Sequence, residues 1–188
     1  MAEKTSENVD RLYELVHEIE TAMLVTRRAD GSLVSRPMAN QDRAPGADFW
    51  FAAEEGSDKV VEIRSEPQVN LTYYKDRTRE WVSIAGTAEV SRDRERIRQL
   101  YKPDWKAWFS DGTSDDPRAG TPEDPRIVLI GVRATSARYM TVDKPQPVVL
   151  FEVAKGILTG RKPDIGEVHQ VSEEELRRSG PSVPQKQA

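Results

Sequence analysis

Residues 49–74 read FWFAAEEGSDKVVEIRSEPQVNLTYY, and the pattern of this segment organises the rest of the chain. Phe49 and Phe51 lie two positions apart on an apolar run, as in a strand, until Glu54-Glu55-Gly56 breaks the run. Ser57 stands where it can cap a helix, and Pro67 stops that helix before alternation resumes. The segment therefore predicts a strand, a tight turn, a short helix and a second strand. The apolar positions behind this prediction are Phe49, Phe51, Val60, Val61, Ile63, Val69, Leu71 and Tyr73.

The start of this short helix is a candidate anion site. Ser57 and Lys59 lie in its first turn, where free amide groups and the positive end of the helix dipole attract negative charge. A capped surface helix with a solvated lysine accounts for the same residues. From this segment alone, both interpretations stay open.

The composition limits the classes of protein to consider. The chain has 188 residues, 37% hydrophobic and 32% charged, which is enough for one domain with a core. Its net charge of −4 disfavours a nucleic-acid partner, because neutralising phosphates supplies much of that affinity. We expect no membrane partner, since no apolar run is long enough to span a bilayer and the polar start lacks a secretory leader. The absence of cysteine excludes disulfides and thiol catalysis and fits a reducing compartment, so we expect a cytoplasmic protein.

Catalytic and metal-binding side chains do not stand out. The only histidines, His17 and His169, are far apart and in no ligand spacing, so we predict no metal site. No side chain is marked by its pattern as a general acid or base, and we name no catalytic residue.

The segment before residue 49 predicts a helix and a hairpin. The helix begins at Thr5 or Ser6, and the turn Asp30-Gly31 joins two antiparallel strands. Pro37 lies in the second strand and cannot donate to a ladder, which indicates an edge, a bulge or a place where a ligand replaces the neighbouring strand. Arg36 beside it is either a solvated charge or a phosphate ligand. The predicted strands are residues 21–27 and 33–41.

The segment after residue 75 predicts two long strands and several helices. Gly86 marks a bulge in the first of these strands, and Ser91 is expected to cap the next helix. Pro147 begins a helix that we take to be the last, and the charged sequence after residue 160 is expected to be a mobile tail. The chain thus divides into a domain at 1–160 and a tail at 161–188. The expected strands are 80–91 and 127–139, and the expected loop is 111–125. An aromatic cluster, expected to lie in a core or at a dimer seam, is formed by Trp105, Trp108 and Phe109.

About six strands with hairpin spacing and intervening helices predict an antiparallel barrel with peripheral helices. Three motifs then resemble the split-barrel flavin-binding family of pyridoxamine 5′-phosphate oxidase. They are Ser35-Arg36-Pro37-Met38, Phe49–Phe51 leading to Ser57–Val60, and Val82–Ala88. The run Lys106–Gly112, followed by Asp115-Asp116-Pro117, is similar to the general stress protein 26 branch.

The resemblance implies a six-stranded antiparallel Greek-key split barrel that forms a homodimer with FMN between the subunits. Carried over, it implies that Arg36, Ser57 and Lys59 hold the FMN phosphate. The backbone of Pro37, Met38 and Ala39 would run beside the flavin ring, and Ala52 and Ala53 would contact the ring or the ribityl chain. We place Trp108 near the cofactor at the dimer seam.

The sequence also departs from the family pattern. Asp58 stands where a basic residue or histidine is common, and Met140 follows Tyr139 where the stress branch tends to have tryptophan. The C-terminal segment that binds substrate in the vitamin B6 oxidases is missing, so we do not expect pyridoxine-phosphate oxidase activity.

The leading hypothesis is an FMN-binding, oxidoreductase-like stress protein whose chemistry occurs at the flavin, with substrate and electron donor unidentified. One alternative is a flavin-binding or sensing module without turnover. Another is a reductase of the same fold that uses the deazaflavin F420, and FAD is a further alternative cofactor.

Overall fold

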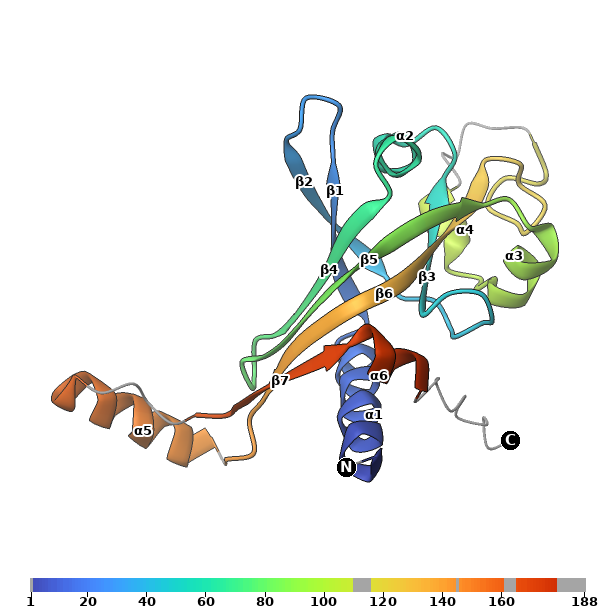
Figure 1. Ribbon diagram of the computed structural model, residues 1–188. Coiled ribbons are helices and arrows are strands. Elements are labelled where there is room, and N and C mark those ends of the chain that lie inside the picture. Colours follow the sequence, from blue (N-terminus) through green and yellow to red (C-terminus); the bar gives the residue numbers. More distant parts are fainter. Residues whose placement is uncertain (1, 110–115, 145, 161–164, 179–188) are drawn as a thin grey trace.

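The computed structural model describes residues 2–109, 116–144, 146–160 and 165–178 (Figure 1). Its helices are α1 (Ala2–Ile19), α2 (Asp58–Ser65), α3 (Arg94–Leu100), α4 (Trp105–Phe109), α5 (Gln146–Thr159) and α6 (Glu173–Arg178). Its strands are β1 (Thr21–Arg27), β2 (Leu33–Ala39), β3 (Phe49–Glu54), β4 (Gln68–Lys75), β5 (Glu80–Ser91), β6 (Ile127–Thr141) and β7 (Glu167–Ser172).

Six strands form one curled antiparallel sheet in the order β2-β1-β4-β5-β6-β3. The seventh strand, β7, pairs with the C-terminal part of β6. Helices flank the sheet (Figure 1), and the arrangement confirms the predicted antiparallel split barrel with peripheral helices. The topology places β2 and β3 at the two ends of the sheet. Pro37 therefore lies on an edge strand, where its missing N–H costs no ladder bond.

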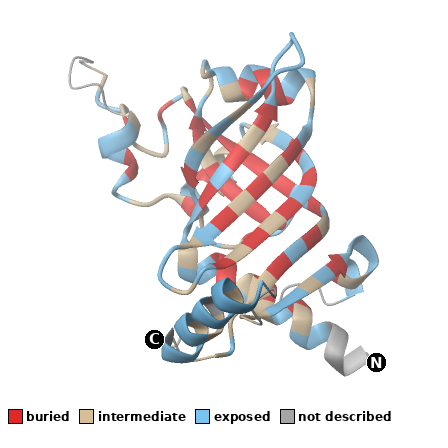
Figure 2. Cartoon of the chain, turned by 90° about the vertical axis from the view of Figure 1, so that its left-hand side faces the viewer, coloured by how far each residue is buried: buried red, intermediate tan, exposed pale blue. Residues whose placement is uncertain are grey.

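The segment from residue 49 to 74 folds as predicted into β3, α2 and β4. Its inward residues Phe51, Leu71 and Tyr73 are almost fully buried in the main core. Alternation of buried and more exposed positions is visible along the strands (Figure 2). The predicted bulge lies between Ala85 and Gly86, and a β-carbon at Gly86 would approach the Arg133 carbonyl oxygen to 2.4 Å.

Helix α1 packs Val9, Leu12 and Leu15 into the same core. It begins at Ala2, earlier than predicted, and the Ser6 hydroxyl donates to Asp10 at 3.4 Å inside the helix instead of capping it.

A second, smaller core lies between the outer face of β3 and β6 and helices α3 and α4. It includes Trp50 and Trp105, both almost fully buried. The prediction that Ser91 caps α3 is wrong, because Ser91 ends β5 and Asp93 accepts hydrogen bonds from the first-turn amides of Glu95 and Arg96. The aromatic cluster divides: Trp105 is core, Phe109 is half-buried, and Trp108 is 81% exposed.

The C-terminal segment differs from the predicted tail at residues 167–178, which form β7 and α6. Val171 and Leu176 are buried in the main core. Arg177 of α6 lies 3.1 Å from the buried carboxylate of Asp48 and donates to the Ala134 carbonyl at 2.8 Å. Helix α5 is therefore not the last helix. Residues 179–188, and residues 110–115 of the predicted loop, lie outside the described residues.

Candidate functional site

The two ends of the sheet, β2 and β3, bound the split in the barrel. Within the described residues, β2 pairs only with β1, and β3 pairs only with β6. One backbone bond, from the Gln41 amide to the Trp50 carbonyl at 2.8 Å, joins the two edges at one end of the split. Five of the residues predicted to contact the cofactor lie on these two edge strands. They are Pro37, Met38 and Ala39 on β2, and Ala52 and Ala53 on β3.

Helix α2 begins where β3 ends, and its first turn has no side-chain cap. Ser57 is the N-cap residue, as predicted, but its hydroxyl donates to the Glu54 carbonyl at 2.6 Å and does not accept a bond from the helix. The first amide groups of a helix have no partner within the helix. The start of α2 therefore keeps N–H donors and the positive end of the dipole for an anion.

Lys59 lies in this first turn and is half-buried. Burial and the nearby positive charge of Arg36 lower the pKa of its amine, while Glu54, Asp58 and Glu62 act in the opposite direction. Among the described residues, the amine forms no hydrogen bond and no ion pair. A half-buried cation without a direct partner is a group that an anion would satisfy.

Arg36 extends from β2 to α2 and is held there by Glu62. One nitrogen of its guanidinium donates to Glu62 Oε2 at 2.8 Å, and the other donates to the Thr26 hydroxyl. Thr26 in turn donates to the same carboxylate at 2.5 Å, and Arg28 Nε lies 3.5 Å from its other oxygen. Burial favours protonation of Glu62, but the Thr26 and Arg36 hydrogen bonds and the charges of Arg36 and Arg28 outweigh it and lower the pKa of this carboxyl.

The ion pair fixes the guanidinium without using all of its donors. A guanidinium has five N–H groups, and the bonds to Thr26 and Glu62 engage two of them. The sequence predicted Arg36 as a candidate ligand but missed Glu62 and Thr26. Glu62 follows Arg36 by 26 positions in the chain and Thr26 by 36 positions. The pairing of these residues follows only from the way α2 packs over the end of the barrel.

The remaining predicted site residues lie in other surroundings. Met38 and Ala53 are buried in the main core, and Ala52 packs against the second core. Pro37 and Ala39 are exposed on the opposite face of β2 from Arg36 and Met38, so what β2 offers a ligand along the split is chiefly its backbone edge. Trp108 is 81% exposed, and in the described part of the chain no hydrogen bond or ring contact joins it to these residues. Its helix is nonetheless tied to the end of the split, because Trp105 Nε1 donates to Gln41 Oε1 at 3.1 Å.

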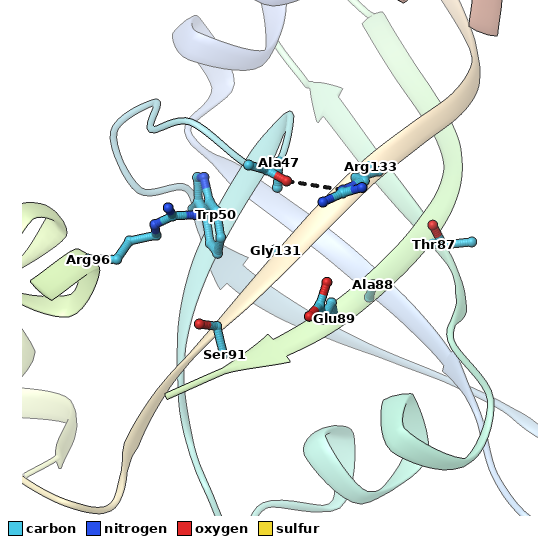
Figure 3. A pocket seen from close by; sticks show the side chains of 10 residues that line it. Ala47, Trp50, Thr87, Ala88, Glu89, Ser91, Arg96, Gly131 and Arg133 are labelled. Carbon is cyan, nitrogen blue, oxygen red and sulfur yellow. Dashed lines mark hydrogen bonds between the residues drawn. The ribbon is translucent and has the colours of Figure 1, made fainter. Parts of the chain in front are cut away.

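Two cavities of about 380 Å³ lie outside this region. One is on the outer face of β3, β5 and β6, where Arg96 stacks 4.9 Å over Trp50 and Arg133 donates to the Gly46 carbonyl at 3.0 Å (Figure 3). The other lies between α1 and the β6–β7 pair and includes Tyr139 and His169. Neither is lined by the predicted phosphate ligands.

Among the described residues, no cluster of three or more histidine or carboxylate side chains is placed to hold a metal ion. In the same part of the chain, no helix has the length and apolar character needed to cross a bilayer.

Residues 7–164 match the family described as pyridoxamine 5′-phosphate oxidase like. The chain belongs to this family. It is 33% identical to protein bli-3 of Neurospora crassa over 158 residues, which are 83% of this chain and 75% of that protein. The family match covers the six strands β1–β6 and helices α2–α5, together with most of α1.

Solved structures of the pyridoxamine 5′-phosphate oxidase-like family agree with this assignment. A crystal structure assigned to general stress protein 26 from Jannaschia sp. has a TM-score of 0.63 and 28% identity, covering 92% of this chain and 99% of its own. A pyridoxamine 5′-phosphate oxidase-related, FMN-binding protein from Nostoc punctiforme has a TM-score of 0.54 over 70% of this chain and 78% of its own, and at 16% identity it shows the fold alone. The predicted likeness to general stress protein 26 is thereby confirmed.

Proposed function

We propose that this protein binds FMN along the split between β2 and β3, with the phosphate at the start of α2. The observation that carries the proposal is the half-buried amine of Lys59, which has no direct partner among the described residues and lies beside an uncapped helix start. A phosphate has the charge and the acceptor oxygens to bind the amine and the free amides together, and the Ser57 hydroxyl would join them by turning from the Glu54 carbonyl to the phosphate.

Arg36 would complete the phosphate site from the other edge of the split. Because Glu62 and Thr26 already fix its guanidinium, the remaining N–H donors are ordered before a ligand arrives. Asp58 opposes an anion, but its side chain is exposed, and water and salt screen its charge.

The two sheet edges suit the rest of the cofactor. Edge strands present unpaired N–H and C=O groups, and the polar rim of a flavin ring offers matching donors and acceptors. The backbone at Pro37, Met38 and Ala39 and the segment Ala52–Ala53 lie on these strands. Bound FMN would supply hydride or electron transfer, while the chain orients it and shields it from water. The FMN-binding description of the Nostoc relative supports this choice of cofactor.

We also propose that two copies form a homodimer with the cofactors at the seam. Trp108 supports this proposal, because a tryptophan that is 81% exposed on one copy can cover a ligand held by the other.

The test is a set of parallel titrations with FMN, FAD, F420 and riboflavin, followed by flavin fluorescence. We expect FMN to bind at least tenfold more tightly than riboflavin, which has the same ring but no phosphate. Tighter binding of F420 would make the protein a deazaflavin member of the fold, and binding of none of the four would refute the proposal. Steady-state NADH or NADPH oxidation by the loaded protein separates an enzyme from a sensing module.

A further inference from the structure

The cavity on the outer face of β3, β5 and β6 is built over a glycine. Gly131 of β6 is the register partner of Trp50 on β3 and of Glu89 on β5, so the three residues form one row across the sheet. The backbones at the two ends of this row lie about 10 Å apart, which is two strand spacings. Because Gly131 has no side chain, a hollow of about 380 Å³ lies over it (Figure 3). This volume is within the range of small-molecule sites.

The packing of Trp50 fixes the floor of the hollow. The indole is 4% exposed, and its Nε1 donates to the Ala44 carbonyl at 2.9 Å, so the ring is held in the second core. A β-carbon at Gly131 would lie 2.8 Å from this ring. No residue larger than glycine fits there without moving the ring, and the hollow is therefore a permanent feature of this sheet surface.

Two guanidinium groups converge on the hollow. Arg96 of α3 donates to the Pro45 carbonyl at 2.6 Å. Arg133 of β6 donates to the Gly46 carbonyl at 3.0 Å. These carbonyls are consecutive in the chain, so the two positive charges lie close together, and each guanidinium keeps further N–H donors. Among the described residues Arg133 forms no ion pair, and the carboxylate that pairs with Arg96 is that of Asp93, 3.9 Å from Nε.

A carboxylate lies across Gly131 from Trp50 and Arg96. The side chain of Glu89 forms no hydrogen bond or ion pair with any described residue. Arg133 is its diagonal neighbour on the same face and is close enough in the register for a direct pair. The Arg133 guanidinium is instead directed to the Gly46 carbonyl (Figure 3). The hollow thus separates two positive charges from one negative charge.

We infer that this hollow binds a small amino acid that carries a second acidic group. Its two carboxylates would pair with Arg96 and Arg133, and its ammonium group with Glu89, in charge-assisted hydrogen bonds. The charges balance, because the two arginines and one glutamate that line the hollow sum to a single positive charge. An amino-dicarboxylate carries a single negative charge at neutral pH.

Other ligand classes satisfy fewer of these groups. A simple dianion would leave the Glu89 carboxylate unpaired and close to negative charge. An amine without acidic groups would leave both guanidinium groups unpaired. The hollow contains none of the residues proposed to hold FMN, so the inference does not depend on the cofactor.

A matched set of three five-carbon compounds tests the inference by isothermal titration calorimetry. The probes are L-glutamate, glutarate, which lacks the ammonium group, and L-glutamine, in which an amide replaces one carboxylate. We expect glutamate to bind most tightly and each of the others about tenfold or more weakly, because each loses one charge-assisted pair. Failure of glutamate to bind, or equal affinity for the three compounds, would overturn the inference.

Two substitutions assign the two halves of the ligand. Glu89→Gln should weaken glutamate about tenfold and should not weaken glutarate, which has no ammonium group. Its fold should be unaffected, since the Glu89 carboxylate has no partner in the described part of the chain. Arg133→Gln should weaken both compounds about tenfold. Arg138→Gln is the matched control, because this exposed arginine lies on the same strand and outside the hollow, and it should change neither affinity.

Circular dichroism checks that each variant is folded. Equal losses for glutamate and glutarate in Glu89→Gln would contradict the placement of the ammonium group. Loss of glutamate binding in Arg138→Gln to the same extent as in Arg133→Gln would show a general charge effect and would overturn the inference.

Discussion

Replacing Lys59 with methionine separates the phosphate site from the rest of the cofactor site. Methionine keeps most of the length of the side chain and removes the amine. In the free protein that amine is half-buried and makes no ion pair with a described residue, so its loss breaks no existing contact. With FMN bound, we expect the amine to make a charge-assisted hydrogen bond to phosphate, which contributes roughly 1.5–3 kcal/mol.

The expected result for Lys59→Met is a rise in the Kd for FMN of about tenfold to one hundredfold. The Kd for riboflavin should change by less than about twofold, since riboflavin presents no phosphate to the start of α2. Both constants come from the same fluorescence titration. Equal losses for the two ligands, or no loss for FMN, would refute the placement of the phosphate.

The same substitution has a signature in the free protein that depends on pH. Burial and Arg36 lower the pKa of Lys59 below its usual 10.5 in the folded state. The unfolded chain therefore holds that proton more strongly, and this lysine makes the unfolding free energy rise as pH increases toward 10.5. In Lys59→Met that part of the rise should be absent. Urea unfolding of both proteins between pH 8 and about 10.5 measures the difference. Parallel curves would show that Lys59 is solvated like an ordinary surface lysine.

Three other substitutions test separate parts of the structure. Arg36→Ala should destabilise the fold by about 3 kcal/mol in urea unfolding, because it leaves the buried Glu62 without its closest charged partner. Arg36→Lys should retain most of that stability and still lose about tenfold in FMN affinity, and equal stability of the two variants would contradict this. Arg177→Ala should lower the free energy of unfolding by about 1–2 kcal/mol, because it detaches α6 from the buried carboxylate of Asp48. Arg178 pairs with an exposed carboxylate, so Arg178→Ala should lower it by under about 0.5 kcal/mol. Equal effects would mean that the contact to the buried carboxylate does not stabilise the fold. Trp108→Ala should weaken the dimer and flavin binding together, and unchanged flavin affinity in the variant would remove this residue from the site.

The sequence predicted the barrel well where the hydrophobic periodicity agrees with the positions of glycine and proline. From residue 49 to 74, an apolar run gives way to helical spacing at Gly56 and to strand-like alternation after Pro67, and β3, α2 and β4 follow these changes. The bulge at Gly86 was predictable because a glycine interrupts an otherwise regular strand. In these places local chemistry and tertiary structure favour the same conformation.

The C-terminal strand and helix were missed because their composition is that of a tail. Only Val171 and Leu176 are buried, and charged residues surround them. A local signal was nonetheless present. Ser172 and Glu175 form a reciprocal capping box, in which the Ser172 amide donates to the glutamate at 2.8 Å. Given more weight than composition, this pattern would have placed the start of α6.

The pairing of Arg36 with Glu62 could not be read from the sequence. An arginine on an edge strand can be satisfied by a carboxylate or by water. Arg36 pairs with the Glu62 carboxylate because α2 lies across the end of the barrel. Lys59 was predictable as a candidate because the first turn of a helix has a known chemistry. That it has no direct partner in the described part of the chain required the structure.

Native mass spectrometry of the protein as purified, with absorbance of the same sample, tests the central claim most directly. We predict a yellow protein that carries one FMN per chain, released as FMN on denaturation. If the cofactor is lost during purification, the colourless protein should take up one added FMN per chain. A protein that stays colourless and retains no FMN when the cofactor is supplied in excess would contradict the account.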